Sequence, residues 1–135
     1  MSDDPHPPGE GGRFLPERAP IASYGNGGFR FAGMSHQGSL LILADGMHAW
    51  PAQRFSEVTP NHFAAVLAAG RRPAFLLFGT GSRMHFPSPD LRKAFVEAGI
   101  ALEAMTTGAA VRTYNILLAE KRDVSAALLA VETVR

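Results

Sequence analysis

The sequence predicts a single α/β domain built in layers, with a central mixed sheet of about five strands, an N-terminal β-hairpin and about three helices. Three observations predict this class. The chain has 135 residues, which is the usual size of one domain with one core. In its second half, short apolar runs alternate with helical segments, an order that joins parallel neighbouring strands through helical crossovers. Its first half holds extended segments separated by glycine turns.

The first twenty residues predict a disordered tail, followed by one α/β domain over 21–135. This segment holds five of the ten prolines and three glycines but few large apolar residues, so it cannot form a core of its own. Its acidic, proline-broken start lacks the basic and apolar regions of a secretory signal. No apolar run approaches the roughly 20 residues of a membrane span. We therefore expect a soluble, cytoplasmic protein without a membrane span.

Two longer strands are predicted at the start of the domain. The segment 29–35, "FRFAGMS", alternates apolar with other residues as a half-buried strand does, and 39–44, "SLLILA", is almost continuously apolar. Gln37-Gly38 lies between them and predicts an antiparallel hairpin. Asp45-Gly46 is a second turn signal, and we expect a short third strand over 47–50.

The glycine-rich stretch 24–30, "YGNGGFR", has two interpretations. A dinucleotide-binding fingerprint needs G-x-G-x-x-G after a strand and before a helix, and here both the spacing and the following strand disagree. A turn that needs positive φ, which glycine adopts without steric cost, is the favoured interpretation. The alternative is a backbone cradle for an anion, assisted by Arg30.

Three helices and three buried strands are predicted in the second part of the domain. Thr59 and Ser88 suit the cap position of the first two helices, each followed by a proline, and Gly70 and Gly99 suit their ends. The third helix is expected over 107–121. The buried strands are expected at 73–81, 100–106 and 124–131.

Composition and charge exclude several classes of function. The formal net charge is +1, too small to drive non-specific nucleic-acid binding, which needs clustered basic residues. The chain has no cysteine, which removes disulfides, thiolate catalysis and cysteine metal sites. Its five histidines are scattered without metal-ligand spacing. We therefore expect no nucleic-acid partner, no metal and no cofactor.

The loop "GTGS" at 79–82 is the first candidate for a binding site. It follows the carboxyl end of a predicted strand, the edge at which open α/β sheets bind ligands, and small residues there let backbone N–H groups approach an anion. Arg83 and His85 add positive charge. The favoured alternative is a tight strand-to-helix loop that binds nothing.

The start of the third helix is the second candidate. Arg112 offers a planar fork for a carboxylate or phosphate, close to other polar side chains. The favoured alternative is that Arg112 and Asn115 hold loops in place through hydrogen bonds. No residue is predicted to be catalytic. The full candidate ligand-binding set is Gly79, Thr80, Gly81, Ser82, Arg83, Arg112, Thr113 and Asn115.

The segments "YGNGGFRFAG", "LLFGTG", "SPDLRKAFVEAGIALEAMTT" and "AAVRTYNILLAEKR" occur in this order, and together they resemble the Mth-type small domain family. That family includes mitochondrial complex I assembly factor three, the adipogenesis-associated Mth-domain protein and many bacterial proteins. The resemblance implies a layered α/β fold with one strand running against the others, and we expect that strand to be the last one. It implies no agreed enzyme activity. Lys121 stands where relatives often have glycine.

Two functions follow from these observations. The first is a non-enzymatic interaction or assembly module that aids respiratory complex I biogenesis, whose partner is another protein or a second copy of the chain. The alternative is a small anionic-ligand-binding protein or enzyme, with its pocket near 79–83 and 112–115. The two differ in whether the glycine loop and the third helix meet in space.

Overall fold

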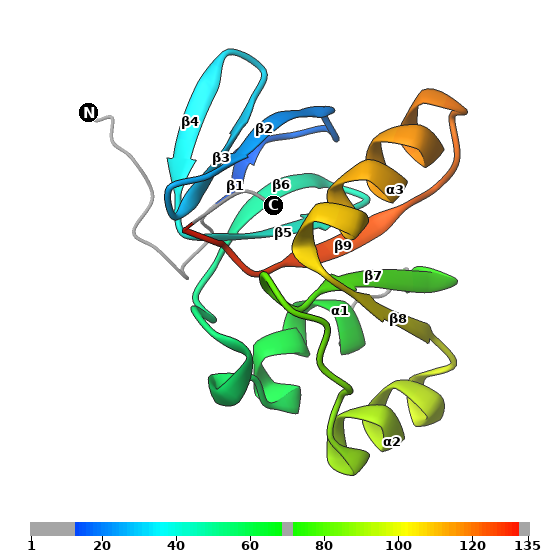
Figure 1. Ribbon diagram of the computed structural model, residues 1–135. Helices are drawn as coiled ribbons and strands as arrows, with labels where there is room; N and C mark the ends of the chain where they lie inside the picture. Colours follow the sequence, from blue (N-terminus) through cyan, green and yellow to red (C-terminus); the bar gives the residue numbers. More distant parts are fainter. Residues whose placement is uncertain (1–12, 69–71, 133–135) are drawn as a thin grey trace, which may run out of the picture.

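The computed structural model describes residues 13–68 and 72–132, which form two sheets and three α-helices around one core (Figure 1). This confirms the predicted single α/β domain. Two 3₁₀ turns, η1 and η2, precede the first helix. The elements are β1 Arg13–Leu15, β2 Ile21–Gly25, β3 Gly28–Phe31, β4 Met34–Gln37, β5 Ser39–Leu43, β6 Gly46–Trp50, η1 Phe55–Glu57, η2 Pro60–Phe63, α1 Ala64–Leu67, β7 Phe75–Gly79, α2 Pro89–Ala98, β8 Ala101–Met105, α3 Thr107–Ala119 and β9 Ser125–Leu128.

The large sheet has the strand order β1-β6-β5-β9-β7-β8. Strands β9, β7 and β8 are parallel, whereas β5 is antiparallel to both of its neighbours, β6 and β9. Among the five strands from β6 to β8, a single strand therefore runs against the others, as the resemblance implied. The prediction that it is the last strand is wrong. Strand β9 follows the helical crossover through α3 and lies parallel to β7. The strand that runs against the other four is β5, which forms an antiparallel hairpin with β6.

The small sheet consists of β2, β3 and β4, all antiparallel. The segment 29–35, predicted as one strand, is divided by a turn at Ala32 and Gly33, both with positive φ. The predicted hairpin at Gln37-Gly38 is therefore wrong, because Gly38 instead leads the chain from the small sheet into β5 of the large one. The turn at Asp45-Gly46 is confirmed as the β5–β6 hairpin.

Part of the range predicted as a disordered tail belongs to the domain. Arg13–Leu15 form β1, which pairs with β6 and adds a sixth strand to the sheet. Residues 16–20 then cross to β2, and Ala19 is buried. The prediction of a disordered tail is therefore wrong for residues 13–20, which belong to the folded domain. Residues 1–12 lie outside the described residues.

The large sheet separates two packed layers (Figure 1). On one face, α3 and the small sheet cover a cluster that contains Phe31, Ile42 and Tyr114. On the other face, α1 and α2 cover a second cluster around Phe63, whose ring makes edge contacts with Phe78 and Phe95. Full burial of such side chains stabilises the fold by roughly 1.5–3 kcal/mol each.

Local signals account for the helix ends. The Leu91 N–H donates to the Ser88 hydroxyl, and Gly99 ends α2 with φ of 74°. The Ala109 N–H donates to the Thr106 hydroxyl at the start of α3. Thr59 stands at the predicted cap position, before η2, and its N–H donates to His62 Nδ1. The predicted end at Gly70 lies outside the described residues.

Candidate functional site

The predicted glycine loop lies at the carboxyl end of β7, directly against the start of α3. Gly79 is the residue that permits this contact, since an added Cβ would lie 2.9 Å from Thr107 Cα. Real Cβ atoms do not approach backbone that closely, so a side chain here would push α3 away from the sheet. The sequence therefore placed the loop correctly, and its first glycine serves helix packing.

Two buried threonines hold the loop in shape. The Thr80 hydroxyl lies 2.7 Å from Arg83 O and 3.1 Å from Met105 O, and it accepts the His85 N–H. The Thr107 hydroxyl accepts the Gly81 N–H at 3.0 Å and donates to Leu129 O at 2.7 Å. Thr107 thus joins the glycine loop to the end of β9. No sequence signal indicated this contact.

The backbone donors at the start of this loop already have partners. The Thr80 N–H donates to Met105 O at 2.8 Å, and the Gly81 N–H is bound by Thr107. A backbone anion cradle needs such groups to be free. The geometry here is that of a braced strand-to-helix loop, the alternative that was favoured for this segment.

The remaining candidate residues fall into three places. Gly81, Ser82 and Arg112 line one small pocket of about 50 Å³ beside Tyr24, so the two predicted segments do meet. Ser82 and Arg83 also line a hollow of about 370 Å³. Thr113 is half-buried in α3 and lines neither.

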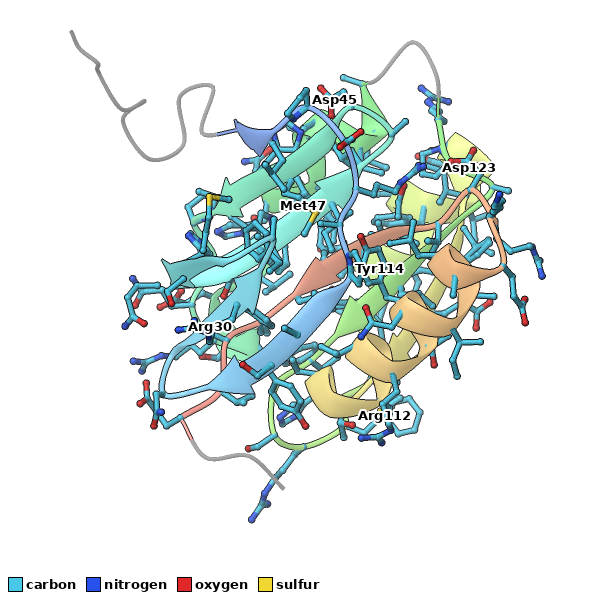
Figure 2. All side chains as sticks on the ribbon, turned by 90° about the horizontal axis from the view of Figure 1, so that it is seen from above. Arg30, Asp45, Met47, Arg112, Tyr114 and Asp123 are labelled. Carbon is cyan, nitrogen blue, oxygen red and sulfur yellow. The ribbon has the colours of Figure 1, made fainter. Side chains whose placement is uncertain are left out.

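Asn115 and its neighbour Tyr114 bind the segment that leads into β2. The Asn115 side chain accepts the Ile21 N–H at 2.8 Å and donates to Ile21 O at 2.9 Å. The Tyr114 hydroxyl donates to Ala19 O at 2.8 Å, and the ring is turned toward Met47 in the interior (Figure 2). Burial raises the pKa of Tyr114 well above its ordinary value, and the nearby positive charge of Arg18 partly offsets this rise. These two side chains therefore fasten residues 19–21 to α3.

The "YGNGG" turn does present backbone donors, but they bind the chain's own backbone. The N–H groups of Asn26 and Gly27 donate to Glu132 O and Val131 O, each at 2.9 Å. Both residues have positive φ, as a tight turn between β2 and β3 requires. The favoured interpretation as a bend that begins a strand is confirmed.

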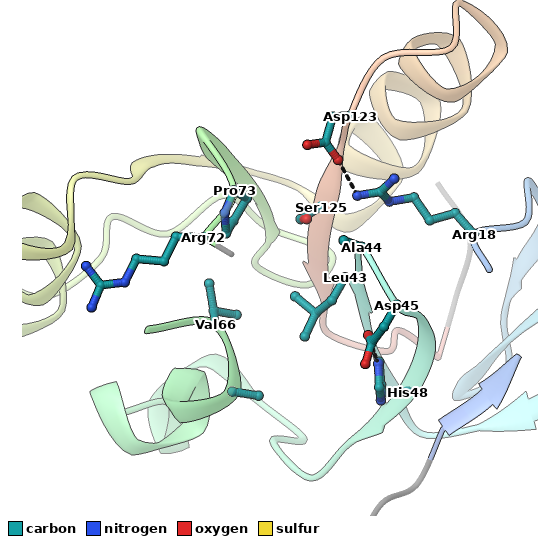
Figure 3. Close-up of a pocket in the computed structure, with 11 residues that line it drawn as sticks. Arg18, Leu43, Ala44, Asp45, His48, Val66, Arg72, Pro73, Asp123 and Ser125 are labelled. Atoms are coloured by element: carbon teal, nitrogen blue, oxygen red, sulfur yellow. Dashed lines mark hydrogen bonds and ion pairs between the residues drawn. The ribbon is translucent and has the colours of Figure 1, made fainter. Parts of the chain in front are cut away.

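A larger cavity, of about 470 Å³, opens at the opposite end of the sheet, where β7 and β9 begin (Figure 3). Arg18 forms an ion pair with Asp123 there, and His48 Nε2 lies 2.7 Å from Asp45. One wall of the cavity is apolar and consists of Leu43, Ala44, Ala65, Val66 and Pro73. The sequence did not indicate this site, because Arg18 lies in the proline-rich range and its partner Asp123 is distant in sequence.

Most of the folded part of the chain matches one family model. The family is described as "Protein of unknown function (DUF498/DUF598)", and the match covers residues 21–129. The chain belongs to this family. The DUF498/DUF598 assignment and the relatives below confirm the resemblance stated from the sequence.

Two relatives show how far the similarity extends along the chain. An uncharacterised protein of Rhodobacter capsulatus is 38% identical over 82% of this chain and 83% of its own length. The mouse NADH dehydrogenase [ubiquinone] 1 alpha subcomplex assembly factor 3 is 28% identical over 85% of this chain. The chain spans 62% of that protein's length.

Solved structures agree with the fold. A Bartonella henselae protein described as an outer membrane protein has a TM-score of 0.83 and 44% identity, covering 88% of this chain and 100% of its own. A Bordetella pertussis protein described as a Mth938-like domain has a TM-score of 0.69 and 31% identity, covering 86% of this chain and 89% of its own. Both are similar to this member of the DUF498/DUF598 family along nearly their entire chains.

Neither a metal-binding cluster nor a membrane-spanning helix is present among the described residues. Over 13–68 and 72–132, no three histidine, aspartate or glutamate side chains gather closely enough to hold a metal ion. In the same part of the chain, no helix has the length and apolar character that crossing a membrane requires.

Proposed function

We propose that this protein is a non-enzymatic interaction module that acts in the cytoplasm and aids the assembly of respiratory complex I. The similarity to complex I assembly factor 3 supports a role in complex I assembly. One surface feature supports binding to another protein. Phe86 is 79% exposed, and Met84 beside it is also exposed. Large apolar side chains held in water on a folded surface are typical of protein-binding sites.

The loop that carries these side chains is braced from both sides. Thr80 binds its first turn, as described above, and the His85 ring stacks on Phe55 with centroids 4.6 Å apart and planes 14° from parallel. At its far end Ser88 caps α2. A partner would therefore meet a preorganised loop, which lowers the entropy lost on binding.

The experiment is affinity capture from the native cell, comparing the parent chain with a Met84→Ser, Phe86→Ser double variant. The parent should enrich subunits of the respiratory NADH dehydrogenase, and the double variant should lose them. Val96→Ser is the matched control, because Val96 is 78% exposed on α2 and lies outside the loop. The proposal fails if the parent recovers no respiratory subunit, or if the double variant recovers them as well as the parent does. Recovery of only a second copy of the chain would replace it with self-association.

Binding of a small anion near 79–83 and 112–115 is a second candidate, supported by the pocket that Gly81, Ser82 and Arg112 share. That pocket is large enough for little more than an inorganic ion. Thermal unfolding with added inorganic phosphate would test it, since a ligand of the folded state raises the midpoint. The expected rise should disappear in Arg112→Ala and persist in Arg122→Ala. No rise in the parent chain would reject this candidate.

A further inference from the structure

The cavity at the end of the sheet where β7 and β9 begin contains two polar groups that the fold leaves unpaired. Ser125, the first residue of β9, is 2% exposed, and within the described residues its hydroxyl has no hydrogen-bond partner. Arg18 Nε is buried, also without a partner. Buried polar atoms in folded proteins are nearly always hydrogen-bonded, so the unpaired Arg18 Nε, in a cavity that Ser125 also lines, indicates a place for an acceptor atom.

The fold holds Arg18 in this position through contacts made by its neighbours. Tyr114 binds Ala19 O, and Asn115 binds both backbone groups of Ile21. The Arg18 side chain is only 16% exposed, and its terminal nitrogen Nη2 is used by Asp123. Because Nε and Nη2 lie on one side of the guanidinium group, Nε is directed beside the carboxylate of Asp123.

Both carboxylates at the cavity already have partners. Arg18 forms an ion pair with Asp123, and His48 Nε2 lies 2.7 Å from Asp45 Oδ1. The Arg72 guanidinium is turned away from the cavity in Figure 3, where its Nε and Nη1 donate to Leu67 O and Ala98 O. An added carboxylate or phosphate would bring negative charge next to Asp123, which is unfavourable in a partly buried site. A neutral acceptor avoids this cost.

We propose that this cavity binds a small uncharged molecule with an apolar body and a carbonyl oxygen, which accepts hydrogen bonds from Ser125 Oγ and Arg18 Nε. The apolar body lies against Leu43, Val66 and Pro73. The volume of about 470 Å³ falls in the range of about 300–1,000 Å³ that is usual for small-molecule sites. This site is separate from the Met84–Phe86 surface, so the two proposals can fail independently.

Cyclohexanone is a suitable probe, because it combines a compact apolar ring with a single carbonyl acceptor. A titration followed by amide NMR signals should shift Ala44, Asp123 and Ser125, which line the cavity, with an affinity on the order of millimolar for so small a molecule. Cyclohexanecarboxylate and inorganic phosphate are the charged comparisons, and both should bind more weakly. No shift at these amides, or tighter binding of either anion, would overturn the proposal.

Variants separate the hydrogen bond from simple filling of an apolar space. Ser125→Ala should weaken cyclohexanone binding by roughly tenfold. Ser82→Ala, at the opposite end of the sheet, is the matched control and should leave binding unchanged. Arg18→Met should weaken binding similarly, and if that variant does not fold, Ser125→Ala still decides. Parent-like binding by Ser125→Ala would refute the assigned acceptor geometry.

Discussion

The two ends of the large sheet differ in how their polar groups are used. At the carboxyl end of β7, the glycine loop has donors and acceptors that bind one another through Thr80 and Thr107. At the opposite end, Arg18 Nε is buried without a partner beside a cavity. Ser125 lines the same cavity, and its hydroxyl has no hydrogen-bond partner within the described residues. Figure 2 places Arg112 toward the first end and Asp45 and Asp123 at the second. The glycine motif that looks most like a binding site in the sequence is thus the more completely paired end.

This difference separates conformational need from ligand binding. Glycine is required at positions 79 and 28 because the backbone of Thr107 and of His36, respectively, lies where a Cβ atom would be. Binding instead needs polar groups that folding leaves available. Here those groups come from residues without a recognisable motif.

The largest effect should come from adding a methyl group to the small sheet at Gly28. In Gly28→Ala the new Cβ would lie 2.2 Å from His36 O on the neighbouring strand, so β3 and β4 must separate. We expect a loss of about 3 kcal/mol in the free energy of unfolding, measured with urea. Gly33→Ala is the control, since no atom lies within 4 Å of its Cβ position, and only its positive φ costs energy. Equal losses in the two variants would contradict the steric account.

Removing the hydroxyl of Tyr114 should have a moderate and pH-dependent effect. Tyr114→Phe leaves Ala19 O without its donor, and we expect a loss of about 1–2 kcal/mol at neutral pH. Burial raises the pKa of Tyr114 in the folded state, so the unfolded chain releases this proton first. The resulting stability is complete below pH of about 10 and is lost as pH rises toward the folded-state pKa.

The measurement is urea unfolding at neutral and alkaline pH. The parent should lose stability steeply above pH of about 10, and Tyr114→Phe should lose less over the same interval. Tyr24→Phe serves as the control, because Tyr24 is only half-buried at the edge of the small sheet. Identical slopes in the parent and Tyr114→Phe would show that Tyr114 is not the buried, neutral group inferred above.

The smallest effect concerns the end of α3, close to the cavity. Lys121 has φ of 62°, while its N–H donates to Leu118 O and the Arg122 N–H donates to Leu117 O. Glycine adopts this conformation without steric cost, so Lys121→Gly should stabilise the protein by about 0.5–1 kcal/mol. Cyclohexanone binding should stay unchanged, because the position of Asp123 does not depend on the Lys121 side chain. A loss of stability would mean that this side chain makes an important contact.

Local sequence signals predicted those parts of the fold that local interactions determine. Ser88 and Gly99 give the ends of α2, and the Asp45-Gly46 turn gives the β5–β6 hairpin. The break between β3 and β4 was missed because Ala32, which has positive φ there, gives no turn signal of its own. The direction of β9 was also missed, because it depends on the path of the chain through α3.

The cavity could not be predicted, because its residues meet only through long-range contacts. Arg18 and Asp123 are 105 positions apart, and Ala19 and Tyr114 are 95 apart. The proline-rich composition around Arg18 predicted disorder, and packing against α3 overrides that tendency. Among the predicted site residues, Asn115 fits the alternative in which it fastens a loop.

The most direct test compares hydroxyl removal at the two ends of the sheet. Thr107→Val leaves Gly81 N–H and Leu129 O without partners and should lower the free energy of unfolding by about 2–3 kcal/mol. Ser125→Ala removes a hydroxyl that has no partner among the described residues and should change it by less than about 0.5 kcal/mol. Similar losses in both variants would contradict the claim that folding uses the polar groups of one end and leaves those of the other available.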